Sequence, residues 1–273
     1  MEKTKKTKIA IIGSGNLGLS IIKGLLASSL KDDIQIIATK RKLPSKALVD
    51  NKNVYFTTDN KLAVENSEVI MFCVQPQQFT TIVDEVKSLL KKKVLISTIT
   101  GLTIRAMEEA VGSACNIVRS MPNTAIAVRQ SMTCLSYNGD KQSIDTAQII
   151  FNCLGKTLII DDDLMQAATV LGASGIAFWL RLIRATTQGG IQMGFKAEEA
   201  KFIAEHTCLG AASILAENPN AHPEAEIDKV TTPKGCTING LNEMEHKGLS
   251  SALIRGLTAS YEMVTKIKEN IEH

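Results

Sequence analysis

Three glycines near the start of the chain have the spacing of a loop that holds a phosphate group. In the run KIAIIGSGNLGLSIIKGLL, Gly13, Gly15 and Gly18 follow a short apolar stretch and open a longer one. In a strand–turn–helix unit, the first glycine permits the tight turn, the second lets backbone amides approach a pyrophosphate, and the third lets the helix pack on the strand. The spacing predicts dinucleotide binding, and a purely structural turn is the alternative.

A second polar run, KVTTPKGCTINGLNEME, extends from Lys229 to Glu245 and leads into a helix-like stretch. Threonines, a proline and a glycine at such a place can cap the helix. The free amides of a first helical turn, with the positive end of the helix dipole, can also hold a small anion. We expect capping and anion binding to be one arrangement, with the hydroxyl of Thr237 beside it.

The end of the second strand-like run, Ile34 to Ala38, indicates which dinucleotide is bound. About 20 residues beyond the glycines, a carboxylate would accept from a free ribose 2′-hydroxyl. Here Thr39, Lys40 and Arg41 follow instead, whereas Asp32 and Asp33 precede the strand. Cationic and hydroxyl groups suit a 2′-phosphate. The sequence therefore favours NADP(H), with NAD(H) possible but less favoured; the alternative is that these charges only solvate a loop.

Two further strand ends carry polar residues. Cys73-Val74-Gln75-Pro76 ends one apolar run, and Ser97-Thr98-Ile99-Thr100-Gly101 ends the next. Ligands of open α/β sheets gather at the carboxyl edge of the strands. Both segments could line the ribose and nicotinamide side of the cofactor, although each alone could equally be an ordinary loop.

These residues need a sheet to position them. From Lys8 to about Asp161, short β-branched runs alternate with helical stretches, which is typical of a doubly wound α/β sheet. After Leu164 only helical segments follow, at about 164–193, 197–217 and 237–271, the last broken near Lys247-Gly248. We predict a nucleotide-binding domain over residues 1–163 and an all-helical domain over 164–273. Its Ala, Gly and Leu content favours a subunit interface, with a helical cap on its own sheet as the alternative.

Composition excludes several classes of protein. The chain has 273 residues, 44% of them hydrophobic, which is enough for a core, and a formal net charge of +3 with one Trp and three Tyr. Few aromatic platforms and a weak charge argue against nucleic-acid binding. Six cysteines without a CxxC pair argue against a zinc site and a disulfide framework and favour a reducing, cytoplasmic setting.

Two other features receive ordinary structural interpretations. The apolar stretch from Leu164 to Ile183 contains Arg181 and several polar residues, so we expect a buried helix of a soluble protein and no membrane span. Asp161-Asp162-Asp163 are expected to initiate a helix at Leu164, because carboxylates favour a helix start. No histidine pair has metal-ligand spacing, and we predict no metal site.

Taken together and in order, five segments resemble the pyrroline-5-carboxylate reductase family over nearly the whole chain: IGSGNLG, VQPQ, RSMPNTAIAV, ASGIAFW and TTPKGCTINGLNEME. The resemblance implies an amino-terminal Rossmann domain and a carboxy-terminal helical domain that interlocks with a second copy as a dimer. It also implies NADPH-dependent reduction of the cyclic imine 1-pyrroline-5-carboxylate to proline in the cytoplasm.

The resemblance also places the site. It puts substrate contacts on Cys236 and Thr237, with a further one near Asp162 at the domain junction. We also predict substrate contacts at Thr232 and Gly235, and the hydroxyl of Thr237 is assigned the catalytic role because the imine nitrogen needs a hydrogen-bond donor. Cofactor contacts, together with those inferred above, fall on Ile12, Gly13, Ser14, Gly15, Asn16, Leu17, Thr39, Lys40, Arg41, Asn60, Cys73, Val74, Gln75, Pro76, Thr98, Ile99 and Thr100.

The chain departs from the family pattern at a few positions. Lys234 precedes Gly235 where the family typically has two glycines, Gln75 stands where a lysine is common, and Ala173-Ser174-Gly175-Ile176 replaces the usual Gly-Ser-Gly-Pro. Lys234 could support a carboxylate, point away or narrow the pocket. Two alternatives therefore stay open: reduction of a different imine, and a non-catalytic nucleotide-binding protein on the same fold.

Overall fold

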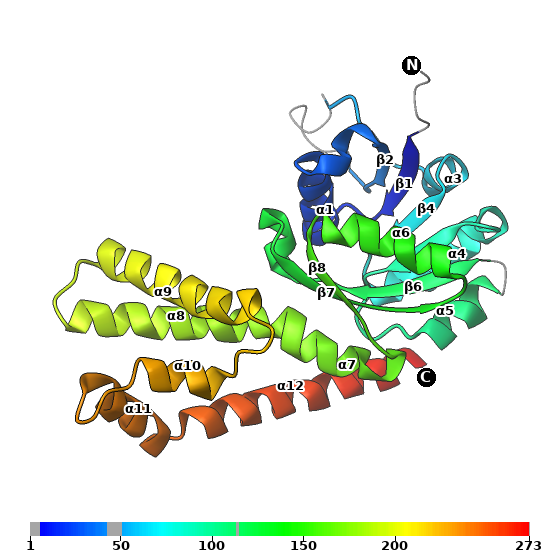
Figure 1. The fold of residues 1–273 in the computed structure, drawn as a ribbon. Helices are drawn as coiled ribbons and strands as arrows, with labels where there is room; N and C mark the ends of the chain where they lie inside the picture. The colour runs from blue at the N-terminus through cyan, green and yellow to red at the C-terminus, as the bar shows by residue number, and fades with distance from the viewer. Residues whose placement is uncertain (1–5, 43–50, 113–114, 273) are drawn as a thin grey trace. The chain divides into compact units, whose positions relative to one another are not determined.

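The computed structural model describes residues 6–42, 51–112 and 115–272 (Figure 1). By contacts the chain divides into two compact units, the first of Met1–Ser174 with Ser260–His273 and the second of Gly175–Ala259. The first unit contains the sheet and the second is helical. The domain boundary after residue 163 stays a prediction. By contacts, the helical run 165–174 and the end of the last helix belong to the sheet unit.

One eight-stranded sheet forms the first unit, in the order β3-β2-β1-β4-β5-β6-β7-β8. The strands β1 to β6 run parallel, β7 is antiparallel to β6, and β8 is parallel to β7. Their bounds are β1 (Thr7–Ile12), β2 (Ile34–Thr39), β3 (Val54–Thr57), β4 (Val69–Phe72), β5 (Val94–Ser97), β6 (Asn116–Met121), β7 (Ser131–Asn138) and β8 (Gly155–Ile159).

Helices cover both faces of this sheet, so the doubly wound Rossmann-type fold predicted from the sequence is confirmed (Figure 1). They are α1 (Asn16–Leu26), α3 (Asn60–Glu65), α4 (Pro76–Val86), α5 (Ile104–Val111) and α6 (Lys141–Asn152). Alternation along β1 explains the two layers: Ile9 and Ile11 pack with α1 and α6, whereas Ala10 and Ile12 pack with α3, α4 and α5. Chain order reverses between β1 and β4, which is where ligands of such sheets bind.

After β8 a short 3₁₀ turn, Asp162–Leu164, leads into α7 (Met165–Ala168) and a π-helical turn, Thr169–Ser174. The second unit begins at the next residue. It contains α8 (Gly175–Gln192), α9 (Ala197–Glu217), α10 (Pro223–Lys229), α11 (Cys236–His246) and the start of α12 (Leu249–Glu272). A Cβ on Gly190 would lie 2.9 Å from the Cβ of Ala200, so small residues let α8 and α9 approach closely.

The prediction of a buried helix over Leu164–Ile183 is wrong within the single chain. Leu171, Trp179 and Leu180 are 64%, 57% and 59% exposed. Among the described residues, one helical run, Asp162–Gln192, has the length and apolar composition that could cross a membrane, and 22% of its most apolar window is buried. The helix pattern identified the element correctly, but burial depends on what packs against it.

Candidate nucleotide and substrate sites

The glycine loop joins β1 to α1, and each glycine meets a different constraint. Gly13 has φ of +94°, and a Cβ there would lie 2.5 Å from Cγ1 of Val74. A Cβ on Gly18 would lie 2.5 Å from the Gly13 carbonyl oxygen, so this glycine allows the helix to approach the strand. A Cβ on Gly15 would meet nothing within 4 Å. The first and third glycines therefore serve the fold, whereas the second leaves open space for a ligand.

The loop is attached to the end of β2 through Thr39. The amide of Gly13 donates to Oγ1 of Thr39 across 3.2 Å, and the amide of Ser14 donates to the Thr39 carbonyl across 2.8 Å. The hydroxyl of Ser14 is buried, and within the described residues it has no hydrogen-bond partner. A buried hydroxyl without a partner is costly, so a ligand oxygen at this loop would satisfy it.

A cavity of about 580 Å³ opens beside this loop at the reversal between β1 and β4. It brings together many of the residues that the sequence singled out: Ile12, Gly13, Ser14, Gly15, Thr39, Lys40, Arg41, Asn60, Cys73, Val74 and Gln75. Its lining also includes Lys42, Thr58, Gln78 and Ile82, which the sequence reasoning missed. Gln78 and Ile82 lie one helical turn apart on α4, so helical spacing after the VQPQ segment could have found them.

Six of the predicted cofactor residues do not line this cavity: Asn16, Leu17, Pro76, Thr98, Ile99 and Thr100. Thr98 and Ile99 are buried at the end of β5, where Oγ1 of Thr98 donates to the Phe72 carbonyl across 3.1 Å. Their contacts with a cofactor stay predictions.

Electrostatics differ between the two ends of the cavity. Lys40, Arg41 and Lys42 follow β2, with Arg41 and Lys42 exposed, and no acidic side chain is among the described lining residues. At Cys73, burial raises the pKa of the thiol to about 12, and a hydrogen bond with Thr98 opposes this shift. The thiol therefore stays neutral near physiological pH. The electrostatic potential of the cavity is positive because of Lys40, Arg41 and Lys42.

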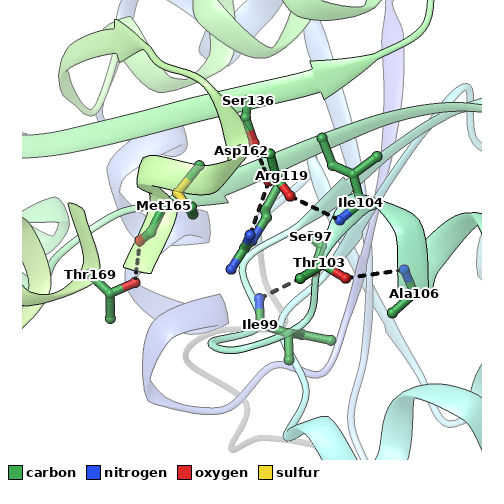
Figure 2. Close-up of polar contacts among 10 residues, drawn as sticks. All are labelled: Ser97, Ile99, Thr103, Ile104, Ala106, Arg119, Ser136, Asp162, Met165 and Thr169. Carbon is green, nitrogen blue, oxygen red and sulfur yellow. Dashed lines mark hydrogen bonds and ion pairs between the residues drawn. The ribbon is translucent and has the colours of Figure 1, made fainter. Parts of the chain in front are cut away.

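Asp162 connects three elements of the sheet unit (Figure 2). Its Oδ1 accepts from Nη1 of Arg119 across 3.0 Å and from Oγ of Ser136 across 2.7 Å. Its Oδ2 accepts from the amide of Ile104, the first residue of α5, across 3.4 Å. Arg119 and Ser136 are paired residues of β6 and β7. The carboxylate therefore joins the two strands and the start of α5.

The predicted helix start at Asp161–Asp163 is confirmed, and the network adds a second role for Asp162. The 3₁₀ turn does begin at Asp162, and α7 follows at Met165, close to the expected start. Asp161 is the N-cap residue without a side-chain capping bond, and the carboxylate of Asp162 accepts from the first residue of α5. A substrate contact of Asp162 stays a prediction.

In the second unit, Thr232-Pro233-Lys234-Gly235 form a tight turn ahead of α11. The amide of Gly235 donates to the Thr232 carbonyl across 2.9 Å, and Lys234 has φ of +59°. Proline followed by a residue with positive φ is the pattern of a type II turn, whose third position favours glycine. The unusual Lys234 thus occupies a left-handed position, which explains why a glycine is typical there.

Gly235 is the N-cap residue of α11, and a Cβ there would overlap the hydroxyl oxygen of Thr232. Among the described residues, no side-chain hydrogen bond caps this helix, whose first residues are Cys236 and Thr237. Cys236 is exposed and Thr237 is half-buried. The amides of the first turn are therefore available to an anion beside the Thr237 hydroxyl.

The predicted substrate residues fall on both units: Asp162 on the sheet unit, and Thr232, Gly235, Cys236 and Thr237 on the helical unit. Among residues 6–42, 51–112 and 115–272, no group of three or more His, Cys, Asp or Glu side chains is arranged to hold a metal ion.

Comparisons with known proteins match both units. Residues 162–267 match the family model described as pyrroline-5-carboxylate reductase dimerisation, and residues 8–101 match the one described as NADP oxidoreductase, coenzyme F420-dependent. Pyrroline-5-carboxylate reductase 1 of Dictyostelium discoideum is 42% identical over 95% of this chain, and the chain spans 49% of that relative's length.

Two further proteins match along nearly their whole length. Pyrroline-5-carboxylate reductase 2 of Dictyostelium discoideum is 39% identical, over 94% of this chain and 92% of that protein. The structure of a pyrroline-5-carboxylate reductase from Coxiella burnetii superposes with a TM-score of 0.87 at 29% identity, covering 96% of this chain and 98% of that one. With the glycine loop, the cationic strand end and the turn before α11 in family order, this chain belongs to the pyrroline-5-carboxylate reductase family.

Proposed function

We propose that this protein reduces 1-pyrroline-5-carboxylate to L-proline with NADPH, as the last step of proline biosynthesis. The observation that carries the substrate assignment is family membership along the whole chain, with a relative 39% identical over 92% of that protein's length. The enzyme class is an NAD(P)H-dependent oxidoreductase that acts on a C=N bond.

The cavity at the glycine loop is the proposed cofactor site. The open space at Gly15 and the unpartnered hydroxyl of Ser14 suit a pyrophosphate, and Lys40 and Arg41 suit a 2′-phosphate. Cys73 to Pro76 and Thr98 to Thr100 would lie toward the nicotinamide. When bound, the nicotinamide supplies the hydride, whereas the protein contributes binding and orientation. The absence of an acid from the described lining favours NADPH over NADH.

The turn before α11 is the proposed substrate site. The free amides at Gly235 to Thr237 would hold the substrate carboxylate, and the helix dipole favours that negative charge. Reduction adds a hydride to the imine carbon, and the nitrogen must gain a proton to become an amine. The Thr237 hydroxyl is the proposed donor toward that nitrogen, so Thr237 is assigned the catalytic role.

The active protein is proposed to be a soluble, cytoplasmic homo-oligomer with a dimer as its minimal unit. Residues 162–267 match a dimerisation family, and large apolar side chains such as Trp179, Phe202 and Leu209 are exposed in the single chain. A second copy would cover such a surface. This assignment also explains why the apolar run Asp162–Gln192 is little buried here. Residues 164–273 would then combine substrate binding with dimerisation.

One observation favours a second candidate, the reduction of a different imine acid. Lys234 places a cation and a side chain in the turn where the family typically has glycine. A larger or more acidic substrate could use that charge. The test is a panel of cyclic and acyclic imine acids at equal concentration with purified protein and NADPH. The proposal expects the highest kcat/KM for 1-pyrroline-5-carboxylate; a higher value for another imine would replace it.

Thr237→Ala tests the catalytic assignment within the same assay. We expect kcat to fall while the Kd for NADPH stays unchanged, because the residue lies outside the nucleotide cavity. An unchanged kcat would remove Thr237 from the mechanism. Turnover on none of the imines, with NADPH still bound, would favour a non-catalytic nucleotide-binding protein.

A further inference from the structure

A mostly buried loop, residues 98–103, joins the end of β5 to the start of α5, and we call it the β5–α5 loop. Its first residue, Thr98, donates through its amide and its Oγ1 to the carbonyl of Phe72, across 3.0 and 3.1 Å. Thr98 also forms a side-chain hydrogen bond with Cys73, which lines the nucleotide cavity. The loop therefore begins beside that cavity, on the side proposed for the nicotinamide.

The β5–α5 loop is anchored at both ends (Figure 2). At its start, the amide of Ile99 donates to Oγ of Ser97 across 3.2 Å. At its far end, the amide of Ile104, the first residue of α5, donates to Oδ2 of Asp162 across 3.4 Å. The carboxylate lies at the amino end of α5, where the positive end of the helix dipole adds to this hydrogen bond. The second anchor thus comes from a residue 58 positions further along the chain.

The other oxygen of Asp162 is held by two strands. Its Oδ1 accepts from Nη1 of Arg119 on β6 and from Oγ of Ser136 on β7. The side chain of Arg119 is buried, so this side of the carboxylate is attached to the interior of the sheet. A carboxylate oxygen has about two lone-pair sites, and these two donors occupy those of Oδ1. Asp162 therefore ties the start of α5 to β6 and β7 through its second oxygen.

We propose that Asp162 is a positioning residue that sets the place of the β5–α5 loop, and through the loop that of the nicotinamide ring, rather than a contact of the imine substrate. The inference rests on the proposed reaction with NADPH. Hydride transfer needs the reacting atoms about 3–3.5 Å apart, and a displacement of about 1 Å slows such a step strongly. The adenosine end of the cofactor, assigned to Lys40 and Arg41, does not depend on this loop.

Asp162→Asn breaks the contact with the loop and keeps the contacts with the strands. The amide oxygen of the new side chain can still accept from Arg119 and Ser136. Its NH₂ group then faces the amide of Ile104, and two donors cannot form a hydrogen bond. The variant therefore releases the start of α5 while the carbonyl side of the new residue stays attached to the sheet.

Four quantities would be measured for the wild type and Asp162→Asn: kcat and KM for 1-pyrroline-5-carboxylate at saturating NADPH, and the Kd values for NADPH and for adenosine 2′,5′-bisphosphate, which lacks the nicotinamide. We expect kcat to fall roughly tenfold to a hundredfold, because the ring is misplaced. The Kd for NADPH should rise roughly threefold to tenfold. The KM for the imine and the Kd for the bisphosphate should stay unchanged, since neither depends on the loop.

Two variants are matched controls. Asp163→Asn makes the same chemical change at the neighbouring exposed residue and should leave all four quantities unchanged. Ser136→Ala removes one hydrogen bond from the carboxylate but keeps Arg119 and the contact with Ile104, so it should lower the temperature of unfolding without changing kcat. An equal fall of kcat in Ser136→Ala would mean that general destabilisation is the cause, and would overturn the inference.

An unchanged kcat for Asp162→Asn would also overturn it. So would a raised KM for the imine with an unchanged Kd for NADPH, because Asp162 would then contact the substrate. Equal losses of affinity for NADPH and the bisphosphate would overturn it as well, because the effect would not be confined to the nicotinamide end. A wild-type protein that reduces no imine would reject the proposed function, whereas the two Kd values would still decide whether Asp162 positions the nicotinamide.

Discussion

Arg119 and Asp162 form a 3.0 Å ion pair inside the sheet unit, and their side chains are 2% and 29% exposed (Figure 2). Removing one partner of such a pair leaves the other charge buried, which typically costs about 3–5 kcal/mol. Because Asp162 is partly exposed, we expect Asp162→Ala to lower the free energy of unfolding by about 2–3 kcal/mol. Chemical denaturation of the purified variant measures this loss.

Asp163→Ala is the matched control, because Asp163 is an exposed neighbour that forms no such pair with any residue that the structure describes. A loss for Asp162→Ala equal to that of Asp163→Ala would mean that the Arg119 pair contributes little to stability.

The second and third glycines of the loop should respond differently to substitution. Gly15→Val places its Cβ in open space at an extended backbone position, so the protein should fold normally and lose dinucleotide binding. Gly18→Ala forces a Cβ against a backbone oxygen, so the free energy of unfolding should fall by about 3 kcal/mol. Thermal unfolding and NADPH titration of both variants check this. A folded Gly15→Val variant that retains its affinity would contradict the placement of the cofactor.

Lys234 is held at a φ that favours glycine, so Lys234→Gly should stabilise the protein by about 1 kcal/mol. The control is Lys247→Gly, because Lys247 has φ of −80° and its replacement relieves no strain. Unfolding curves for both variants measure the effect. If Lys234→Gly is no more stable than the wild type, the turn does not store this strain.

Arg41 should discriminate between the two nicotinamide cofactors. Arg41→Asp replaces a phosphate partner with a like charge, so the Kd for NADPH should rise roughly tenfold to a hundredfold, and that for NADH much less. Lys61→Asp makes the same charge change on α3, outside the described lining of the cavity. Titration of both cofactors provides the measurement. Equal effects of Arg41→Asp on both would remove the electrostatic basis for NADPH preference.

The sequence predicted well those strands that are buried on both faces, because nearly all of their residues are apolar. The strands β1, β4 and β5 are covered on both faces, and their β-branched runs leave little ambiguity. The edge strand β8 was missed because Gly155–Ile159 is mostly exposed and carries no comparable run. The short helix α10 was also missed, since its seven residues are too few for a clear helical period.

Local motifs located part of the site, whereas contacts between distant segments could not be predicted from them. The glycine spacing placed Gly13 and Gly15 at the cavity, and the polar run from Lys229 marked the start of α11. By contrast, the pairing of Asp162 with Arg119 spans 43 residues and depends on the register of β6 and β7. Likewise, the meeting of Asn60 of α3 and Ile82 of α4 at one cavity depends on how these two helices pack together.

The most direct test of the proposed reaction follows the hydride itself. The protein would be incubated with 1-pyrroline-5-carboxylate and NADPH carrying deuterium at the transferable position of the nicotinamide, and the product would be analysed by mass spectrometry and NMR. The account predicts proline with one deuterium on the former imine carbon, in equal amount to the NADPH oxidised. Proline without deuterium, or bound NADPH with no proline formed, would contradict it.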